Sequence, residues 1–156
     1  MKNVTAKIDR SKYRTIFSDG THQVIGDEPD PFGTDEGTDP YSLLLMALGG
    51  CVAMTIRMYA DRKKWDLEGV EVTLSQKRVH HKDCEECDST DGYAHLIEKK
   101  VELLGNLNDA QRARLMEIAD RCPVNKTLLN EIKIRTVEVY STINHITNQK
   151  DEKTIK

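Results

Sequence analysis

The sequence predicts a fold of the α+β class, because strand-like and helix-like stretches occupy separate parts of the chain. Apolar and polar residues alternate over residues 3–25, 69–80 and 93–104, as they do in strands with one buried face. Residues 40–65 and 109–121 instead follow helical patterns. Strands and helices grouped in this way are typical of helices packed on antiparallel sheets.

Length and composition are those of a single soluble domain. The 156 residues are 38% apolar and 31% charged, and their net charge is −3. We expect residues 1–140 to form this domain and residues 141–156 to be a polar C-terminal tail. The negative charge gives no general reason to expect nucleic acid as a partner.

The start of the chain contains no recognisable export signal, since Met1-Lys2-Asn3 leads directly into an alternating stretch. The longest uncharged stretch, residues 40–56, is short for a membrane span and contains two adjacent glycines. It is therefore interpreted as a buried helix, with no membrane as partner. The expected location is cytoplasmic, where the four cysteines favour catalysis, metal binding or simple packing over structural disulfides.

The N-terminal part predicts two or three short strands within residues 3–25. Ser18-Asp19-Gly20 is typical of a hairpin turn between two of them. Residues 26–38 are rich in acidic residues, proline and glycine and show no periodicity, which predicts a loop.

The first helix is predicted to begin at Asp39-Pro40 and to end near Trp65. Asp39 can cap the free amides, and proline suits the first helical position. Residues 43–54 are apolar on every face, a pattern typical of a helix buried on all sides. Because one layer of structure in a chain of this size can hardly cover such a helix, we expect a second subunit to cover part of it.

The middle of the chain predicts a long antiparallel pair of strands, residues 69–80 and about 93–104. Val70, Val72 and Leu74 alternate with polar residues in the first of them. The connecting stretch, residues 80–92, is highly polar and is predicted to be the tip of a hairpin.

A second helix is predicted over residues 109–121. Asn108 can cap its free amides, and Gln111 can return a hydrogen bond to the cap. Pro123 should interrupt this helix and allow a new helical turn to begin. A last strand is predicted at about residues 132–140.

Two cysteines lie in apolar helical stretches far apart in the sequence. Cys51 is in the middle of the first helix, directly after Gly49-Gly50, where paired glycines indicate a close approach of backbone or ligand. Cys122 precedes Pro123 at a helix boundary, where free amides can stabilise a thiolate. From these settings alone, inert packing stays open as an alternative for each residue, because cysteine is often a small buried apolar residue.

Two motifs around these cysteines resemble those of the OsmC/Ohr family. The stretch from Thr38 to Cys51 resembles the family's central helix, in which a proline is followed eleven residues later by the reactive cysteine. Arg121-Cys122-Pro123-Val124 resembles the second-cysteine motif. The similarity covers about residues 22–136, and it extends toward one branch of the family in three further stretches: residues 55–65, 83–87 and 111–120.

The resemblance implies a fold, an assembly and a chemistry. The fold is α+β and OsmC-like, with two central helices packed on antiparallel sheets. Two chains intertwine as a homodimer, with each active site at the interface. Cys51 is then the catalytic thiolate that reduces an organic hydroperoxide and becomes a sulfenic acid, which condenses with Cys122 to a disulfide. A dithiol reductant of the lipoyl or thioredoxin type restores both thiols, and no cofactor is required.

A reactive thiolate in an apolar site needs a cation nearby, since burial disfavours the charged form. In better-known family members an arginine from the early strands fills this role, held by a glutamate just after the helix-starting proline. Here Tyr41 and Ser42 follow Pro40 instead, which predicts a weaker or altered activity. The candidate thiolate-activating residues in this chain are Arg14, Arg10 and His22.

Two further hypotheses stay open. The dimer could instead sense oxidants or bind a small apolar ligand without catalysis. The second cysteine pair also suggests a zinc-stabilised interaction module at the hairpin tip, with the donors His80, His81, Cys84 and Cys87. Against zinc, all four donors come from one short segment, so an exposed loop or an accessory disulfide is the alternative there.

Overall fold

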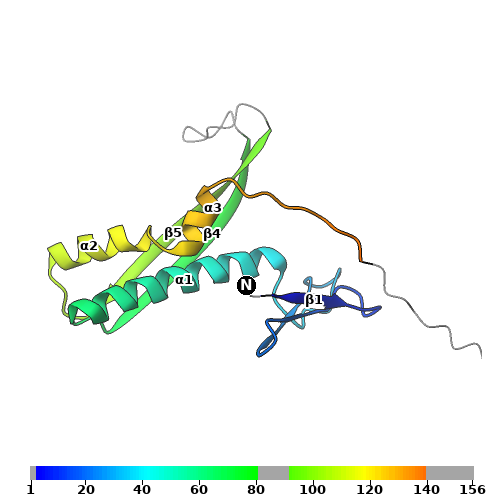
Figure 1. The fold of residues 1–156 in the computed structure, drawn as a ribbon, viewed down its shortest axis with the longest axis horizontal. Helices are drawn as coiled ribbons and strands as arrows, with labels where there is room; N and C mark the ends of the chain where they lie inside the picture. Colours follow the sequence, from blue (N-terminus) through cyan, green and yellow to red (C-terminus); the bar gives the residue numbers. More distant parts are fainter. Residues whose placement is uncertain (1–2, 81–91, 140–156) are drawn as a thin grey trace, which may run out of the picture.

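The computed structural model describes residues 3–80 and 92–139 and has the predicted α+β class (Figure 1). The predicted tail, residues 141–156, lies outside the described residues. The elements follow in the order β1 (Thr5–Ile8), β2 (Thr15–Ser18), β3 (Gln23–Gly26), α1 (Pro40–Lys63), β4 (Gly69–His80), β5 (Tyr93–Leu104), α2 (Asp109–Ala119) and α3 (Pro123–Leu129).

Strands β1, β2 and β3 form an antiparallel sheet that lies beyond the N-terminal end of α1 (Figure 1). The turn between β2 and β3 lies where the sequence predicts it, and Gly20 adopts a φ of +90° there. The Asp19 carboxylate accepts hydrogen bonds from the amides of Thr21 at 2.9 Å and His22 at 2.7 Å. This local capping explains why the short hairpin forms at this position.

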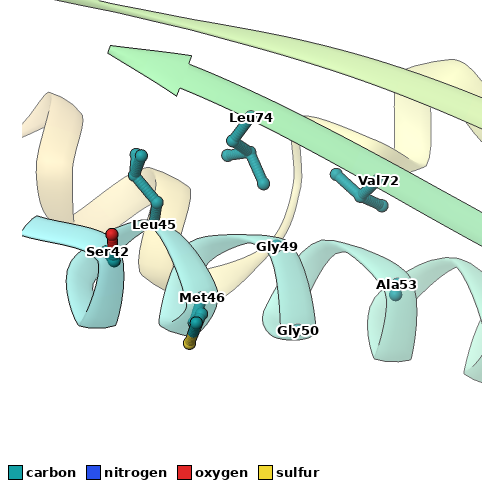
Figure 2. Close-up of a pocket in the computed structure, with 8 residues that line it drawn as sticks. All are labelled: Ser42, Leu45, Met46, Gly49, Gly50, Ala53, Val72 and Leu74. Carbon is teal, nitrogen blue, oxygen red and sulfur yellow. The ribbon is translucent and has the colours of Figure 1, made fainter. Parts of the chain in front are cut away.

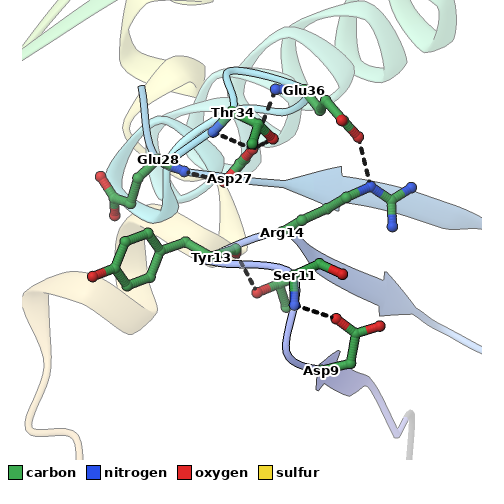
Figure 3. A network of polar contacts seen from close by, with 9 residues as sticks. Asp9, Ser11, Tyr13, Arg14, Asp27, Glu28, Thr34 and Glu36 are labelled. Atoms are coloured by element: carbon green, nitrogen blue, oxygen red, sulfur yellow. Dashed lines mark hydrogen bonds and ion pairs between the residues drawn. The ribbon is translucent and has the colours of Figure 1, made fainter. Parts of the chain in front are cut away.

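The predicted loop after β3 is ordered by one buried carboxylate, that of Asp27 (Figure 3). Its oxygens accept hydrogen bonds from the amides of Glu28 at 2.8 Å, Thr34 at 3.0 Å and Glu36 at 3.3 Å. The hydrogen bond from the Thr34 hydroxyl is the largest influence on this carboxyl and lowers the pKa of Asp27. A polar loop without periodicity thus acquires a fixed shape from its own side chain.

Helix α1 begins as predicted, with Asp39 as its N-cap and Pro40 at its first position. Asp39 accepts hydrogen bonds from the amides of Tyr41 at 2.9 Å and Ser42 at 3.1 Å. Lys64 ends the helix in a left-handed conformation with a φ of 55°, close to the predicted end at Trp65.

Only one stripe of α1 is buried within the chain. Leu48, Val52, Ile56 and Ala60 are at most 2% exposed, and their spacing of four places them on one face. Large apolar side chains on other faces are more than half exposed: Tyr41, Met46, Met54 and Met58. Among the described residues, packing partners lie on one face only, which agrees with the expectation that one chain can hardly cover this helix; cover by a second subunit stays a prediction.

Strands β4 and β5 form the predicted long antiparallel hairpin, in register from Gly69 opposite Leu104 to His80 opposite Tyr93. Helix α1 runs along this hairpin, with α2 and α3 beside it (Figure 1). The core cluster of α1 is contacted by alternating residues of the two strands: Val70, Val72, Leu74, Ile97, Val101 and Leu103. This alternation is the one that the sequence predicts for strands with a single buried face.

Helix α2 carries the predicted capping box, in which Asn108 and Gln111 exchange two hydrogen bonds of 2.9 Å. Leu115, at 0% exposure, anchors the helix in the core. Pro123 begins the short helix α3, as predicted, with Cys122 as its N-cap. The corner between α2 and α3 thereby places a cysteine against the central helix.

Residues 130–139 do not form the predicted last strand. They run extended away from α3 without a strand partner among the described residues, and Ile134, Val137 and Val139 are 87%, 81% and 84% exposed (Figure 1). A strand pattern is stable only beside another strand, and the described residues offer none to this segment.

Helix α1 is, among the described residues, the one helix long and apolar enough to cross a membrane by length and composition. Its packing against β4, α2 and α3 buries one stripe of it in the core of the fold. This is the core-helix interpretation that the sequence favours.

Candidate functional site

The two cysteines of the predicted site lie together. Cys51, half-buried in the middle of α1, and Cys122, fully buried before α3, share a side-chain hydrogen bond and are both free thiols. The core cluster of the fold includes Cys122 and packs against Cys51. Two sulfur atoms from distant parts of the sequence are thus within reach of each other.

Burial is the largest single influence on the Cys51 thiol and raises its pKa. Hydrogen bonds with the Cys122 side chain, the Val124 amide and the Thr55 side chain act in the opposite direction. Together they outweigh burial, so the pKa of Cys51 lies below its ordinary value. Cys51 is therefore the sulfur that this environment prepares to ionise.

The pKa of Cys122 is shifted in the opposite direction. Burial, followed by the hydrogen bond with Cys51 and the charge on that residue, raises the pKa of Cys122. The amide of Asn125 donates to the Cys122 sulfur at 3.4 Å, but it does not compensate for burial. The amides at the start of α3 thus lower the pKa of Cys122 as the sequence predicts, but burial and the neighbouring Cys51 outweigh them.

Removal of the Thr55 hydroxyl tests this asymmetry. Thr55→Val keeps the side-chain shape but deletes one hydrogen bond that lowers the pKa of Cys51, so the pH midpoint of Cys51 alkylation by iodoacetamide should rise. The midpoint is measured by peptide mass spectrometry across a pH series.

Thr127→Val is the matched control for that variant. Thr127 makes the same kind of backbone bond on α3, from its hydroxyl to the Pro123 carbonyl at 3.1 Å, as Thr55 makes to the Cys51 carbonyl at 2.7 Å. Its replacement should leave the pH midpoint of Cys51 alkylation unchanged. Equal midpoints in wild type and Thr55→Val would show that the hydroxyl does not tune Cys51.

Lys99 holds the corner that carries Cys122. Its ammonium group donates to the carboxylate of Asp120 and to the side-chain oxygen of Asn125, both at 2.9 Å, and its side chain is only 18% exposed. Asn125 in turn reaches back to the Asp120 carbonyl at 3.2 Å and supplies the amide that contacts the Cys122 sulfur. Strand β5 thereby fixes the position of Cys122.

Lys99 was not among the site residues predicted from the sequence, although one signal was present. Lys99 occupies an inward position of β5 between Ile97 and Val101, where the alternation predicts an apolar residue. A charged residue at such a position indicates a polar partner inside the fold.

The three predicted activating residues do not reach the cysteines within the chain. Arg14 donates through its Nε to the Glu36 carboxylate at 2.8 Å (Figure 3). His22 is 80% exposed and contacts Asp19 at 3.3 Å, and Arg10 is exposed. Across residues 3–80 and 92–139, none of the three donates a hydrogen bond to either sulfur.

Arg14 nevertheless has a carboxylate partner, although the residues after Pro40 supply none. Glu36 lies in the loop before α1, and its amide is bound by the buried Asp27 (Figure 3). The chain therefore contains an arginine–glutamate pair in which the glutamate comes from a different position than in the better-known family members. No local pattern predicts this pair, because Arg14 and Glu36 are 22 residues apart in the sequence.

Two hollows flank α1. The first, of about 440 Å³, is apolar and lies against β4, with Leu45, Met46, Gly50 and Val72 in its wall (Figure 2). Gly49 permits this packing, because a Cβ atom there would lie 2.7 Å from Leu74, whereas Gly50 faces open space. The predicted close approach is thus confirmed at Gly49 alone.

The second hollow, of about 540 Å³, lies between α1 and α2 on the side of the cysteines. Thr55, the hydrogen-bond partner of Cys51, and Pro123, the residue after Cys122, both line it. It therefore lies next to the sulfur pair, although neither cysteine is among its lining residues.

The proposed zinc donors are described only in part. His80 ends β4, with its ring 5.2 Å from that of Tyr93 in an edge-on contact. His81, Cys84 and Cys87 lie outside the described residues, so the zinc hypothesis stays untested.

The sequence profile of the OsmC-like protein family matches residues 33–137. The matched part contains both cysteines, α1 and the β4–β5 hairpin. The chain belongs to the OsmC-like protein family. No match is found among curated protein sequences.

Solved structures of OsmC-like proteins have the same fold. An OsmC-like protein from Mycoplasma pneumoniae is 18% identical, with a TM-score of 0.65 over 82% of this chain and 86% of that one. An organic hydroperoxide resistance protein OsmC from Legionella pneumophila is 19% identical, with a TM-score of 0.58 over 83% and 89%. The organic hydroperoxide resistance protein OhrB of Bacillus subtilis is 16% identical, with a TM-score of 0.56 over 83% and 90%. At these identities the likeness concerns the OsmC-like fold.

Proposed function

We propose that the chain is a thiol peroxidase that reduces organic hydroperoxides through Cys51 and Cys122. The observation that carries this proposal is the pair of hydrogen-bonded thiols with opposite pKa shifts, lowered at Cys51 and raised at Cys122. A related role belongs to the similar structures from Legionella pneumophila and Bacillus subtilis, which are organic hydroperoxide resistance proteins. A cytoplasmic site of action belongs to the same proposal.

The reaction proceeds in three balanced steps. The Cys51 thiolate attacks one peroxide oxygen, the O–O bond breaks, and the alkoxide leaves as the alcohol after taking up a proton. The Cys122 sulfur then attacks the Cys51 sulfenic acid, which releases water and forms the disulfide. A dithiol of the lipoyl or thioredoxin type reduces this disulfide by exchange, and it leaves oxidised. None of these steps uses a metal or an organic cofactor.

The proposal includes an intertwined homodimer. Three apolar features are left uncovered by the part of the chain that the structure describes: the outer face of α1, the hollow of Figure 2 and residues 130–139. Contiguous exposed apolar surface of this kind is typical of an interface. A second copy that covers these features also brings groups of one chain toward the cysteines of the other.

Arg14 is proposed as the residue that activates Cys51, across this interface. Glu36 fixes its guanidinium and leaves other donors available. Arg14→Ala should lower kcat/KM for cumene hydroperoxide by about 10- to 100-fold, the loss of one or two charge-assisted contacts to a thiolate.

The alternative candidates are tested in the same assay. Arg10→Ala and His22→Ala should stay within about threefold of wild type, as exposed surface substitutions do. A larger loss in either of these variants than in Arg14→Ala would reassign the activating residue.

Steady-state turnover tests the function as a whole. Wild-type protein is supplied with cumene hydroperoxide and dihydrolipoamide, and peroxide consumption is followed with enzyme at less than one-hundredth of the substrate concentration. Many turnovers per active site are expected. A disulfide that forms once and is not reduced by dihydrolipoamide or reduced thioredoxin would instead favour the oxidant-sensing function.

A further inference from the structure

We propose that Lys99 is a positioning residue for the second step of the reaction, in which Cys122 attacks the Cys51 sulfenic acid. By holding Cys122 in place, it directs this intermediate to the disulfide and away from irreversible oxidation. The inference rests on the proposed peroxidase function and adds a residue to it. It is carried by a closed set of hydrogen bonds that joins strand β5 to the corner between α2 and α3.

Lys99 extends into the fold from the inward face of β5. It pairs with Leu74 of β4, and its neighbours on the same face, Ile97 and Val101, pack against the core cluster. Its side chain is only 18% exposed, and an ammonium group removed from water costs free energy unless polar partners replace the water. The contacts that this ammonium group makes therefore have to offset the cost.

The two partners of the Lys99 ammonium group lie on either side of Cys122 in the sequence. Asp120 is the C-cap of α2, and Asn125 lies in the first turn of α3. The Asp120 carboxylate and the Asn125 side-chain oxygen both accept from Lys99 at 2.9 Å. One point of β5 thus holds the end of one helix and the start of the next, with Cys122 between them.

Asn125 transmits this restraint to the Cys122 sulfur. Its side-chain oxygen accepts from Lys99, and its side-chain nitrogen donates to the Asp120 carbonyl at 3.2 Å. Because both ends of the amide group are bound, the residue is held in one orientation, and its backbone N–H donates to the Cys122 sulfur at 3.4 Å. Lys99 therefore acts on Cys122 through Asn125 and contacts neither sulfur in this hydrogen-bonded set.

The Cys51 sulfenic acid has two competing fates. Attack by the Cys122 sulfur forms the S–S bond and releases water. Attack of the sulfenic sulfur on a second hydroperoxide breaks another O–O bond, which gives the sulfinic acid and one more molecule of alcohol. A dithiol does not reduce the sulfinic acid, so this second fate ends the cycle. The position of Cys122 decides between the two, because a displacement of about 1 Å can slow such an attack about 100-fold.

Lys99→Met tests the inference, since methionine keeps a long unbranched side chain and removes the ammonium group. Reduced protein is mixed with a concentration series of cumene hydroperoxide without a reductant, and mass spectrometry quantifies Cys51 as disulfide or as sulfinic acid. The peroxide concentration that converts half of Cys51 to the sulfinic acid should fall about tenfold. This partition concerns the sulfenic acid alone, so a change in the rate of its formation does not alter the result.

Lys100→Met is the matched control, because Lys100 is the next residue of β5 and points outward. Its side chain is 76% exposed, and its ammonium group contacts Glu98 at 3.4 Å. Its replacement should leave the half-conversion concentration within about twofold of wild type. Equal shifts in Lys99→Met and Lys100→Met would overturn the proposal, because loss of a charge anywhere on β5 would then explain the result.

Asn125→Ala interrupts the same path at its second link, and it keeps the proposal testable if Lys99→Met does not fold. It removes the bonds to Lys99 and to the Asp120 carbonyl but keeps the backbone N–H, and the residue is partly exposed. The half-conversion concentration should again fall about tenfold, and the double variant should show little further change. A wild-type value in Asn125→Ala, or in folded Lys99→Met, would overturn the proposal.

The reduction potential of the cysteine pair separates this inference from the peroxidase proposal, because its measurement needs no peroxide. Each protein is equilibrated with mixtures of reduced and oxidised dithiothreitol. Lys99→Met should lower the equilibrium constant for disulfide formation about tenfold, which raises the potential by about 30 mV. That shift, in a protein whose wild type fails to reduce cumene hydroperoxide, would reject the reaction and retain the positioning role. Unchanged potential and partition in an active peroxidase would reject the positioning role and retain the reaction.

Discussion

Cys51→Ser is expected to abolish turnover of cumene hydroperoxide, with kcat/KM reduced about a thousandfold or more. The serine hydroxyl cannot ionise in this environment, whereas hydrogen bonds from Cys122, Val124 and Thr55 lower the pKa of the native thiol. The measurement is the initial rate of peroxide loss with dihydrolipoamide as reductant. Circular dichroism checks that the variant is folded.

Cys122→Ser is the informative comparison for that result, because it removes the second sulfur and leaves the first. This variant should consume one equivalent of peroxide and then stop, with Cys51 trapped as a sulfenic acid that reacts with dimedone. Cys51→Ser should give no dimedone adduct at Cys122, whose pKa is raised by burial. An adduct at Cys122 in the Cys51→Ser protein would reverse the proposed roles.

Leu115→Ala is expected to lower the free energy of unfolding by about 3–4 kcal/mol. Leu115 is fully buried in α2 and belongs to the core cluster formed with α1 and the β4–β5 hairpin. Its truncation leaves a cavity that the surrounding side chains fill only in part. Urea denaturation followed by circular dichroism measures the change.

Met116→Ala is the matched control for the core substitution, since Met116 is the next residue of α2 and is 43% exposed. This substitution should lower the free energy of unfolding by less than about 1 kcal/mol. Similar losses for the two variants would mean that α2 does not pack as the structure places it.

Local signals predicted most of the fold. Asp39-Pro40 located the start of α1, Asn108 and Gln111 located the start of α2, and the alternation of residues 69–80 and 93–104 predicted the long hairpin. These elements were predictable because caps and strand alternation depend on neighbouring residues in the sequence.

The candidate site was predictable in part. Its two cysteines were identified by motifs, but three of its features depend on tertiary packing. These are the Lys99 bridge to Asn125, the pairing of Arg14 with Glu36 and the hollow between α1 and α2. Each joins side chains that are distant in the sequence, so no local pattern predicts it.

The strand expected near residues 132–140 marks a second limit of sequence analysis. The apolar alternation there indicates strand propensity, but a strand needs a neighbour, and residues 3–80 and 92–139 provide none to Ile134 or Val137. Likewise, the exposed apolar faces of α1 predict an assembly of more than one chain.

The central claim is that Cys51 and Cys122 act as one redox pair, and the most direct test is a map of disulfides after oxidation. Fully reduced protein is treated with one equivalent of cumene hydroperoxide, alkylated and digested, and its peptides are identified by mass spectrometry. A single linked species joining the Cys51 and Cys122 peptides is the expected result. Recovery of both cysteines as alkylated thiols would contradict the account.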